Sequence, residues 1–202
     1  MIDTLRLAAL SGALLSAVLL GGLLGVSLMN DRFVLWPAPD RNSWRFKLSF
    51  GLFRVFCGAT IVFALADWGS MGWEHWSRLA VGGPVMVGSF AALIYCYWFL
   101  GIDNTYCGED GLVTGGIYAY SRNPQYVSSV IATAALAITT GSAGALGLTV
   151  VLLALYTQFA LNEERWLRER YSTAFGWYVE ATPRFVDARS VRRARADLIA
   201  AI

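Results

Sequence analysis

The sequence predicts an all-α integral membrane protein, a helical bundle of about five transmembrane helices with an amphipathic cytoplasmic helix near its C-terminal end. Two observations lead to this prediction. Of the 202 residues, 56% are hydrophobic and 15% are charged, whereas a soluble domain is about 45–50% apolar and about 25% charged. Apolar runs recur along the chain, and several approach the roughly 20 residues that a membrane span needs. A single domain over residues 1–202 is the natural expectation.

Composition also narrows the function classes. The net charge is only +2, so nothing favours a nucleic-acid partner. Cys57, Cys96 and Cys107 form no CxxC motif, and the first two lie in apolar runs, where Cys is usually a small buried hydrophobe. His75 is the only histidine, so we expect no histidine-based metal site. The oligomeric state stays open.

The predicted spans cover residues 5–29, 48–66, 79–102, 124–140 and 145–161. The first carries no charge after Arg6; a cleaved signal peptide is the alternative, disfavoured because the run is long and no small-x-small site follows it. The second contains Arg54, which either snorkels to the surface beside Lys47 or contacts a substrate headgroup or cofactor. The third ends in an aromatic cluster that can line a site, although such a cluster is more often an interfacial belt.

The last two spans are separated by four small residues, Gly141-Ser142-Ala143-Gly144, which predict a tight helical hairpin. Beyond this hairpin the sequence is no longer continuously apolar. Apolar residues at spacings of three and four predict an amphipathic helix on the membrane surface, namely Leu167, Tyr171, Phe175 and Tyr178. Residues 186–202 form a basic tail, either solvated or docked on the membrane.

The distribution of basic residues predicts the orientation. On the side of the N-terminus only Arg6 and Arg78 are basic, whereas the loops 30–47 and 103–123 and the C-terminal region together hold 13 Lys or Arg. By the positive-inside rule the N-terminus is outside and the C-terminus is cytoplasmic.

Two polar segments are candidates for chemistry. Residues 112–126 form a glycine-broken loop that ends in Asn123-Pro124, where Asn can cap a helix with its side-chain oxygen and Pro suits the first helical position. Asn162-Glu163-Glu164 stands where apolar sequence ends; ordinary solvated carboxylates are the alternative interpretation. The predicted hairpin brings both segments to the cytoplasmic face, where a cleft can form. Its free backbone N–H groups would attract a carboxylate, and its tyrosines and carboxylates a cation or ribose hydroxyls.

The first segment, Leu112-Val113-Thr114-x-Gly116-x-Tyr118-x3-Arg122-Asn123-Pro124-x-Tyr126, resembles the signature of the isoprenylcysteine carboxyl methyltransferase family, which is related to membrane phospholipid methyltransferases. The second segment is similar to that family's other motif; it reads Glu163-Glu164-x2-Leu167-x3-Tyr171-x3-Phe175-x2-Tyr178, then Pro183-Arg184-Phe185. Within this resemblance, residues 1–102 are three N-terminal membrane helices, residues 103–185 the catalytic core and residues 186–202 a tail.

The resemblance implies an enzyme that uses S-adenosyl-L-methionine and transfers a methyl group in line to a lipid or hydrophobic small molecule. It implies ten cofactor-binding residues: Asp110, Leu112, Val113, Tyr118, Asn123, Pro124, Gln125, Tyr126, Glu163 and Arg184. Glu163 and Glu164 are the candidate catalytic residues, able to help remove a proton from an ammonium acceptor. Arg54 and Gln158 are the candidate substrate contacts.

Two departures from the family pattern bear on the substrate. Asn123 stands where the family usually has His, and Asn cannot take up a proton near neutral pH; we expect it to keep the cap and the cofactor contact. The family's arginine one turn before the glutamates is missing, since residues 158–161 read Gln-Phe-Ala-Leu. This argues against a prenylcysteine carboxylate and leaves an amine, a thiol or another lipid.

Two alternative functions stay open. An NADPH-dependent lipid double-bond reductase of the same superfamily would be expected to carry an added basic cluster for the 2′-phosphate, and the chain shows none. A non-enzymatic membrane or transport protein would be expected to place polar residues at mid-membrane, whereas here they gather at one face.

Overall fold

The computed structural model describes residues 1–101, 104 and 111–200. Within these residues it contains helices and no strand, which confirms the predicted all-α class. The long helices are α1 (Ile2–Met29), α2 (Trp44–Ala66), α3 (His75–Leu100), α5 (Pro124–Thr140) and α6 (Ala143–Ala181). A short 3-10 helix, η1 (Gly116–Ala119), precedes α5, and α7 (Ala188–Ala200) follows α6.

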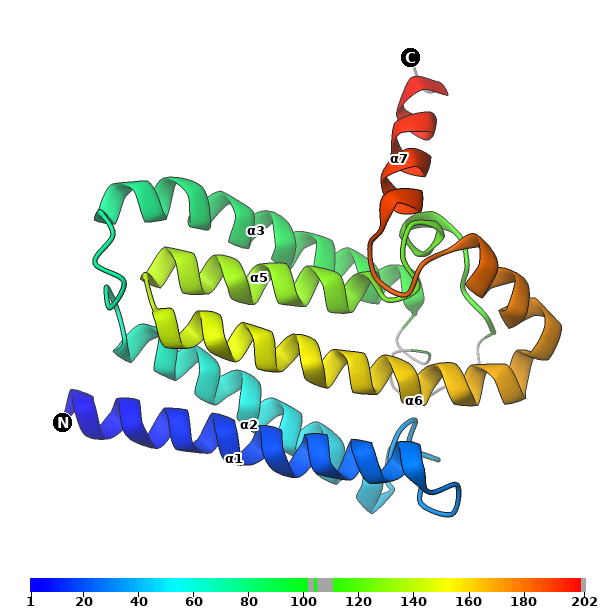
Figure 1. Ribbon diagram of the computed structural model, residues 1–202, viewed down its shortest axis with the longest axis horizontal. Helices are drawn as coiled ribbons and strands as arrows, with labels where there is room; N and C mark the ends of the chain where they lie inside the picture. The colour runs from blue at the N-terminus through cyan, green and yellow to red at the C-terminus, as the bar shows by residue number, and fades with distance from the viewer. Residues whose placement is uncertain (102–103, 105–110, 201–202) are drawn as a thin grey trace.

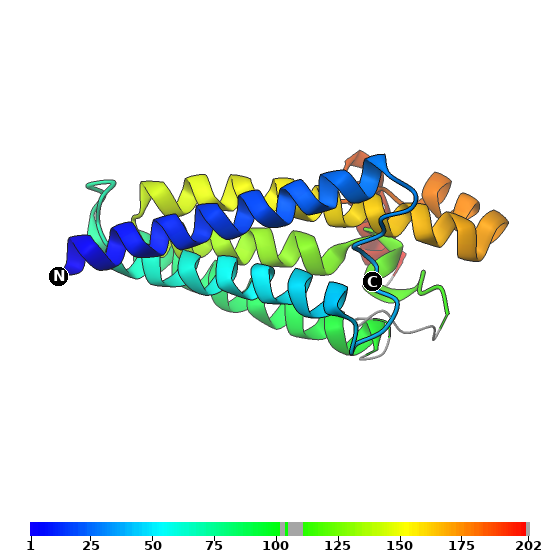
Figure 2. The ribbon, with the colours of Figure 1, turned by 90° about the horizontal axis from the view of Figure 1, so that it is seen from below.

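The five long helices lie side by side along the long axis of the molecule (Figures 1 and 2). Helix α1 packs against α2 and α6, α3 packs against α5, and α5 packs against α6. Helix α7 stands across this axis at the end of the bundle (Figure 1). The core between the helices is apolar and includes Leu20, Leu24, Phe56, Leu148 and Leu152, all at most 2% exposed.

The bundle has the dimensions and surface of a membrane domain. By length and composition, four of the described helices are suited to cross a membrane: α1, α2, α3 and α6. Helix α5 has 17 residues, the lower end of the range for a span, and it lies among the others. Large apolar side chains are exposed on the outer helix faces, among them Val18 (70%) and Ile94 (68%), as expected where lipid covers them. The prediction of about five spans is thus confirmed in outline.

The α5–α6 hairpin is tighter than predicted. Gly141 adopts the left-handed conformation (φ 64°) that ends α5, a conformation that glycine takes without steric cost. Ser142 is already the N-cap of α6, since its Oγ accepts a hydrogen bond from the Ala145 N–H. The linker is therefore two residues and not four. A hydrogen bond from Ser142 Oγ to Asp67 Oδ2 (2.6 Å) ties this turn to the end of α2.

Helix α6 continues well past the predicted end at residue 161, up to Ala181. Residues 162–171 are mostly strong helix formers, so nothing in them stops the helix where the apolar run ends. The interruption comes at Ser172, which has φ 39° and ψ −108°, an unfavourable conformation for a residue other than glycine. After this kink the helix folds back over the end of the bundle (Figure 1), and Phe175 becomes 1% exposed.

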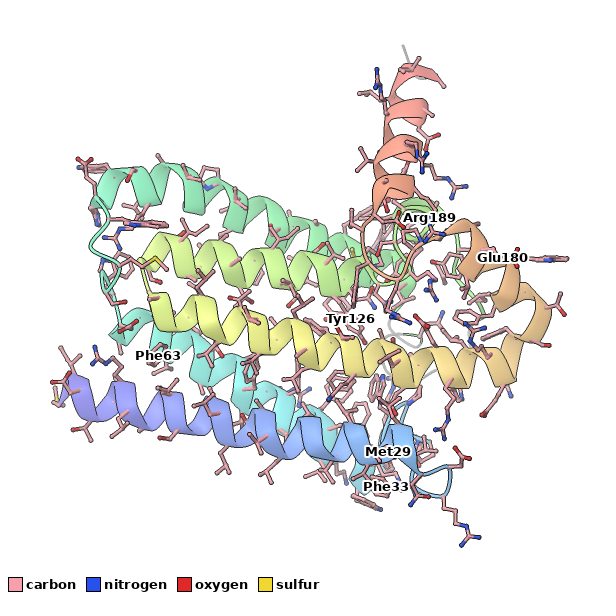
Figure 3. All side chains as sticks on the ribbon, in the orientation of Figure 1. Met29, Phe33, Phe63, Tyr126, Glu180 and Arg189 are labelled. Carbon is pink, nitrogen blue, oxygen red and sulfur yellow. The ribbon has the colours of Figure 1, made fainter. Side chains whose placement is uncertain are left out.

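The basic tail is helical as α7 and is tied to the rest of the chain at several points. Arg189 Nη1 donates to the Glu180 carbonyl at 3.0 Å, a pair labelled in Figure 3. Ser190 Oγ donates to the Tyr120 carbonyl (2.6 Å), and Tyr120 Oη donates to Asp197 Oδ2 (2.6 Å). The docking of this tail on a membrane surface stays a prediction.

Candidate active site

The three consecutive residues Asn162, Glu163 and Glu164 point in three directions, because each step along an α-helix turns the side chain by about 100°. Asn162 faces α1, where its Oδ1 accepts a hydrogen bond from Ser27 Oγ (2.7 Å). Its Nδ2 donates to the Leu24 carbonyl at 3.3 Å. Asn162 therefore fixes α1 against α6, and the two glutamates are left for other partners.

Glu163 is held by two donors from distant parts of the chain. Its Oε1 accepts hydrogen bonds from Trp36 Nε1 (2.7 Å) and from Tyr126 Oη (2.8 Å). Trp36 reaches this position because Ser27 Oγ, besides its bond to Asn162, accepts a hydrogen bond from the Leu35 N–H (3.0 Å). The sequence identified Tyr126 but missed Trp36 as a site residue; the only signal for it is the apolar run Phe33-Val34-Leu35-Trp36 inside the basic loop 30–47.

Glu164 binds two arginines and joins the two motifs. Arg184 donates to it with both Nε (2.6 Å) and Nη2 (3.0 Å), the two-pronged geometry that makes arginine–carboxylate pairs strong. This hydrogen bonding raises the pKa of the Arg184 guanidinium above its ordinary value. Arg122 Nη1 lies 3.0 Å from Glu164 Oε1. Glu164 thus links the loop before α5 to the segment after α6.

The end of α6 and the residues after it, residues 178–185, lie along the loop as a strap. The Arg122 N–H donates to the Pro183 carbonyl (2.9 Å), and Tyr178 Oη donates to the Tyr118 carbonyl (2.7 Å). Asn123 Nδ2 donates to the Arg184 carbonyl (3.1 Å). These bonds join the two motifs into one site.

The prediction that the Asn123 side chain caps α5 is wrong. Asn123 occupies the N-cap position, but its side chain makes no capping hydrogen bond. The Tyr126 N–H, which a cap would serve, already donates to the backbone carbonyl of Asn123 (3.1 Å). The amide is therefore free to bind the strap at Arg184.

A cleft, which we call the loop cleft, opens between the loop, the end of α3 and the C-terminal half of α6. Its space, open solvent at the mouth included, is about 820 Å³. At the loop's turn Gly116 has φ 56°, and a Cβ there would collide with the Phe99 ring, so glycine is required. Seven of the predicted site residues line this cleft: Leu112, Val113, Tyr118, Asn123, Gln125, Glu163 and Glu164.

The other predicted residues lie elsewhere. Pro124 is buried as the first residue of α5, and Arg184 contacts Glu164 without lining the cleft. Asp110 lies outside the described residues. Arg54 is exposed on α2 with its guanidinium 5.6 Å from the Phe50 ring, and Gln158 faces α1 near Gly21; neither borders the loop cleft.

A second cavity adjoins the loop cleft, and we call it the aromatic pocket. It is lined mainly by aromatic side chains: Trp36, Phe50, Phe53, Tyr97, Tyr126, Tyr156 and Phe159. Glu163 and Gln125 line both cavities. In Figure 3 the label of Tyr126 marks this region. It lies toward the end of the bundle that holds Met29 and away from the end that holds Phe63. The Glu163 carboxylate therefore stands where the two cavities meet.

Comparison with known proteins gives one match. Residues 77–174 match the family model described as phospholipid methyltransferase. No curated protein and no solved structure matches the chain. The matched part runs from α3 to just after the Ser172 kink, so it includes the loop motif and both glutamates, and it amounts to just under half of the chain. The resemblance predicted from the two motifs is therefore confirmed: over residues 77–174 this chain is similar to the phospholipid methyltransferase family.

Proposed function

We propose that this protein is an integral membrane methyltransferase that uses S-adenosylmethionine and methylates a lipid or a hydrophobic small molecule. The observation that carries the proposal is the position of Glu163, which lines both the loop cleft and the aromatic pocket. In the proposed reaction the soluble methyl donor and the hydrophobic acceptor must meet at one point, and Glu163 lies at such a point. The family match supports the same reaction class.

The residues of the loop cleft suit this cofactor. S-adenosylmethionine supplies a methyl group on a positively charged sulfur, together with an adenosine and an amino-acid end. The cleft offers the Glu163 carboxylate for the cation, Tyr118 and Phe175 for apolar and aromatic surface, and the backbone of Leu112 and Val113 for polar contacts. Asn123 and Gln125 add side-chain amides to the same wall. A carboxylate among aromatic rings is a general solution for binding a cationic ligand.

The roles of the two glutamates differ in this proposal. Trp36 and Tyr126 hold the Glu163 carboxylate in one orientation, and it borders the site of either reactant, so we assign to it the contact with the cationic centre and the removal of a proton from an ammonium acceptor. Glu164 is bound to Arg184 and Arg122, so it is a positioning residue. Holding the methyl donor and the acceptor in the reactive orientation can lower the barrier by roughly 7–11 kcal/mol.

The aromatic pocket is the proposed site of the acceptor. It lies between α2, α3, α5 and α6, helices whose outer faces are apolar, and its walls are rings that exclude water. The charge distribution of the loops favours a cytoplasmic position for the loop cleft. In this arrangement the cofactor comes from the cytoplasm and the acceptor from the bilayer.

Calorimetric titration of the detergent-solubilised protein tests the proposal. We expect heat of binding with S-adenosylmethionine and with S-adenosylhomocysteine and none with NADPH. Binding of NADPH alone would instead indicate a reductase, and binding of none of the three would contradict an enzyme of either kind. Incubation with a methyl-labelled donor and total membrane lipid then identifies the acceptor by the lipid class that takes up the label.

A further inference from the structure

Arg122 has unused hydrogen-bonding capacity inside the loop cleft. Its side chain is only 8% exposed, and it is one of the residues lining the cleft. Among the residues that the structure describes, neither its Nε nor its Nη1 has a hydrogen-bond partner. A guanidinium has five N–H donors, and buried polar groups of this kind are almost always bonded. These two donors without a hydrogen-bond partner therefore point to a ligand group that accepts hydrogen bonds.

The surrounding charges favour an anion as this group. The carboxylate of Glu164 is already engaged on both oxygens by Arg184, and its contact with Arg122 is an ion pair without hydrogen-bond geometry. Arg168 lies nearby, since its guanidinium is 5.6 Å and that of Arg122 is 5.9 Å from the same Phe175 ring. Three guanidiniums, those of Arg122, Arg168 and Arg184, thus gather near the carboxylate of Glu164.

Burial lowers the pKa of Arg122 from its ordinary value, and Arg184 and Arg168 lower it further, against the opposite effect of Glu164. The guanidinium remains charged in any case, because arginine does not lose its proton in proteins. A second anion at this point would remove the unfavourable excess of positive charge.

We propose that Arg122 binds the carboxylate of the cofactor's amino-acid end through its Nε–H and Nη1–H groups. This inference rests on the proposed function, because it assumes S-adenosylmethionine in the loop cleft. Arg122 borders the loop cleft only, whereas Glu163 borders both cavities. Anchoring the anionic end at Arg122 leaves the cationic sulfur to be bound beside Glu163, so the two side chains together set the direction in which the cofactor lies.

A phospholipid phosphate has the same acceptor chemistry, and position favours the cofactor. The acceptor is proposed to occupy the aromatic pocket, and Arg122 is not among the residues that line it. Arg122 instead belongs to the loop motif and shares a wall of the loop cleft with Tyr118 and Asn123. A phosphate bound by Arg122 is therefore an outcome that would contradict the inference.

The test compares two ligands on four proteins by calorimetry. The ligands are S-adenosylmethionine and its decarboxylated analogue, which lacks only the carboxylate. The proteins are the unmodified chain, Arg122→Gln, Arg122→Lys, and Arg195→Gln as a matched control for loss of one positive charge on the exposed face of α7. Thermal unfolding of each variant, recorded alongside, identifies any that does not fold.

We expect the unmodified protein and Arg195→Gln to bind the decarboxylated analogue about tenfold to a hundredfold more weakly, as for loss of hydrogen bonds to a charged group. In Arg122→Gln the two ligands should bind within about twofold of each other, and Arg122→Lys should recover part of the preference. A folded Arg122→Gln that keeps the full preference would overturn the inference, and so would an unmodified protein without any preference, even though its cofactor binding would leave the proposed function intact.

Two further outcomes separate the alternatives. If the unmodified protein binds neither ligand, the proposed function fails and the inference falls with it. If Arg122→Gln keeps its preference between the two ligands but binds a phospholipid in nanodiscs less tightly than the unmodified protein does, with a matched diacylglycerol unaffected, the anion is the lipid phosphate and the inference is wrong.

Discussion

Trp36 and Glu163 are separated by 127 residues and are joined by a hydrogen bond of 2.7 Å from the indole Nε1 to Oε1. The match to the phospholipid methyltransferase family begins only at residue 77, so the indole comes from the part of the chain outside it. The two N-terminal helices therefore do more than anchor the protein in a membrane. The loop between them carries Trp36, one of the two donors that hold the Glu163 carboxylate where the two cavities meet.

We predict that Trp36→Phe lowers methyl transfer about tenfold or more while the protein stays folded. A hydrogen bond to a charged group contributes about 1.5–3 kcal/mol, and its loss would leave Glu163 oriented by Tyr126 alone. Phenylalanine keeps the ring contacts that Trp36 makes with Phe50 and Phe159. Transfer of label from the methyl donor to lipid measures the effect. Trp44→Phe, at a residue that is 57% exposed, is the control; equal rates in both variants would contradict a role for the indole.

Substitutions of the two glutamates should impair different properties, stability for Glu164 and turnover for Glu163. Glu164→Gln leaves Arg122 and Arg184 with only a neutral amide between them, and breaking a buried ion pair costs about 3–5 kcal/mol. We therefore expect a lower midpoint of thermal unfolding for Glu164→Gln. Glu163→Gln leaves no arginine without its partner, so we expect a nearly unchanged midpoint and a large loss of turnover.

Unfolding followed by circular dichroism, together with the label-transfer assay, checks this pair of expectations. If Glu163→Gln kept both its turnover and its affinity for the cofactor, the proposed catalytic role of Glu163 would be lost. If Glu164→Gln unfolded at the same temperature as the unmodified protein, its link to the two arginines would not be structural.

Much of the bundle follows from the sequence because membrane spans depend on local composition. The start of α5 at Pro124 and its end at Thr140 agree with the predicted range, since Asn-Pro and a glycine stop are local signals. The proximity of Tyr126 to Glu163 also follows, because a hairpin of fixed length must bring its two ends to the same face. Such predictions need no knowledge of how distant helices pack.

The residues that the sequence did not reveal depend on packing. Trp36 reaches Glu163 only because Ser27 is bound to Asn162 across the α1–α6 contact, which no local pattern records. The kink at Ser172 follows a run of good helix formers, and the bond from Tyr178 to the loop holds the turn after it over the cleft. The Asn123 amide likewise binds Arg184. Each of these contacts joins segments whose arrangement is fixed by the whole bundle.

The hydrogen bond from Asn123 to the strap predicts how three substitutions at Asn123 rank in stability. Asn123→Asp replaces the Nδ2 donor with a charged oxygen that would face the Arg184 carbonyl, so we expect a larger loss of stability than for Asn123→Ala, which should cost about 1 kcal/mol as one hydrogen bond. Asn123→His, the residue usual in the family, keeps an N–H donor and should be the mildest of the three. Thermal unfolding midpoints rank the series; an Asp variant as stable as the His variant would contradict the role of the donor.

The close contact of α3 with α5 at Gly82 predicts a difference between two neighbouring glycines. A Cβ at Gly82 would collide with Thr139 Oγ1 and lie 2.8 Å from the Thr139 backbone nitrogen, whereas a Cβ at Gly83 meets nothing within 4 Å. Small residues at such crossings let membrane helices approach closely. Gly82→Ala should therefore push α3 away from α5 and cost about 1–3 kcal/mol, as overpacking does. Gly83→Ala makes the same chemical change one residue later and should be neutral or stabilise by up to about 1 kcal/mol, because alanine favours helix over glycine. Thermal unfolding of both variants in the same detergent checks this, and equal midpoints would show that α3 and α5 do not meet at Gly82.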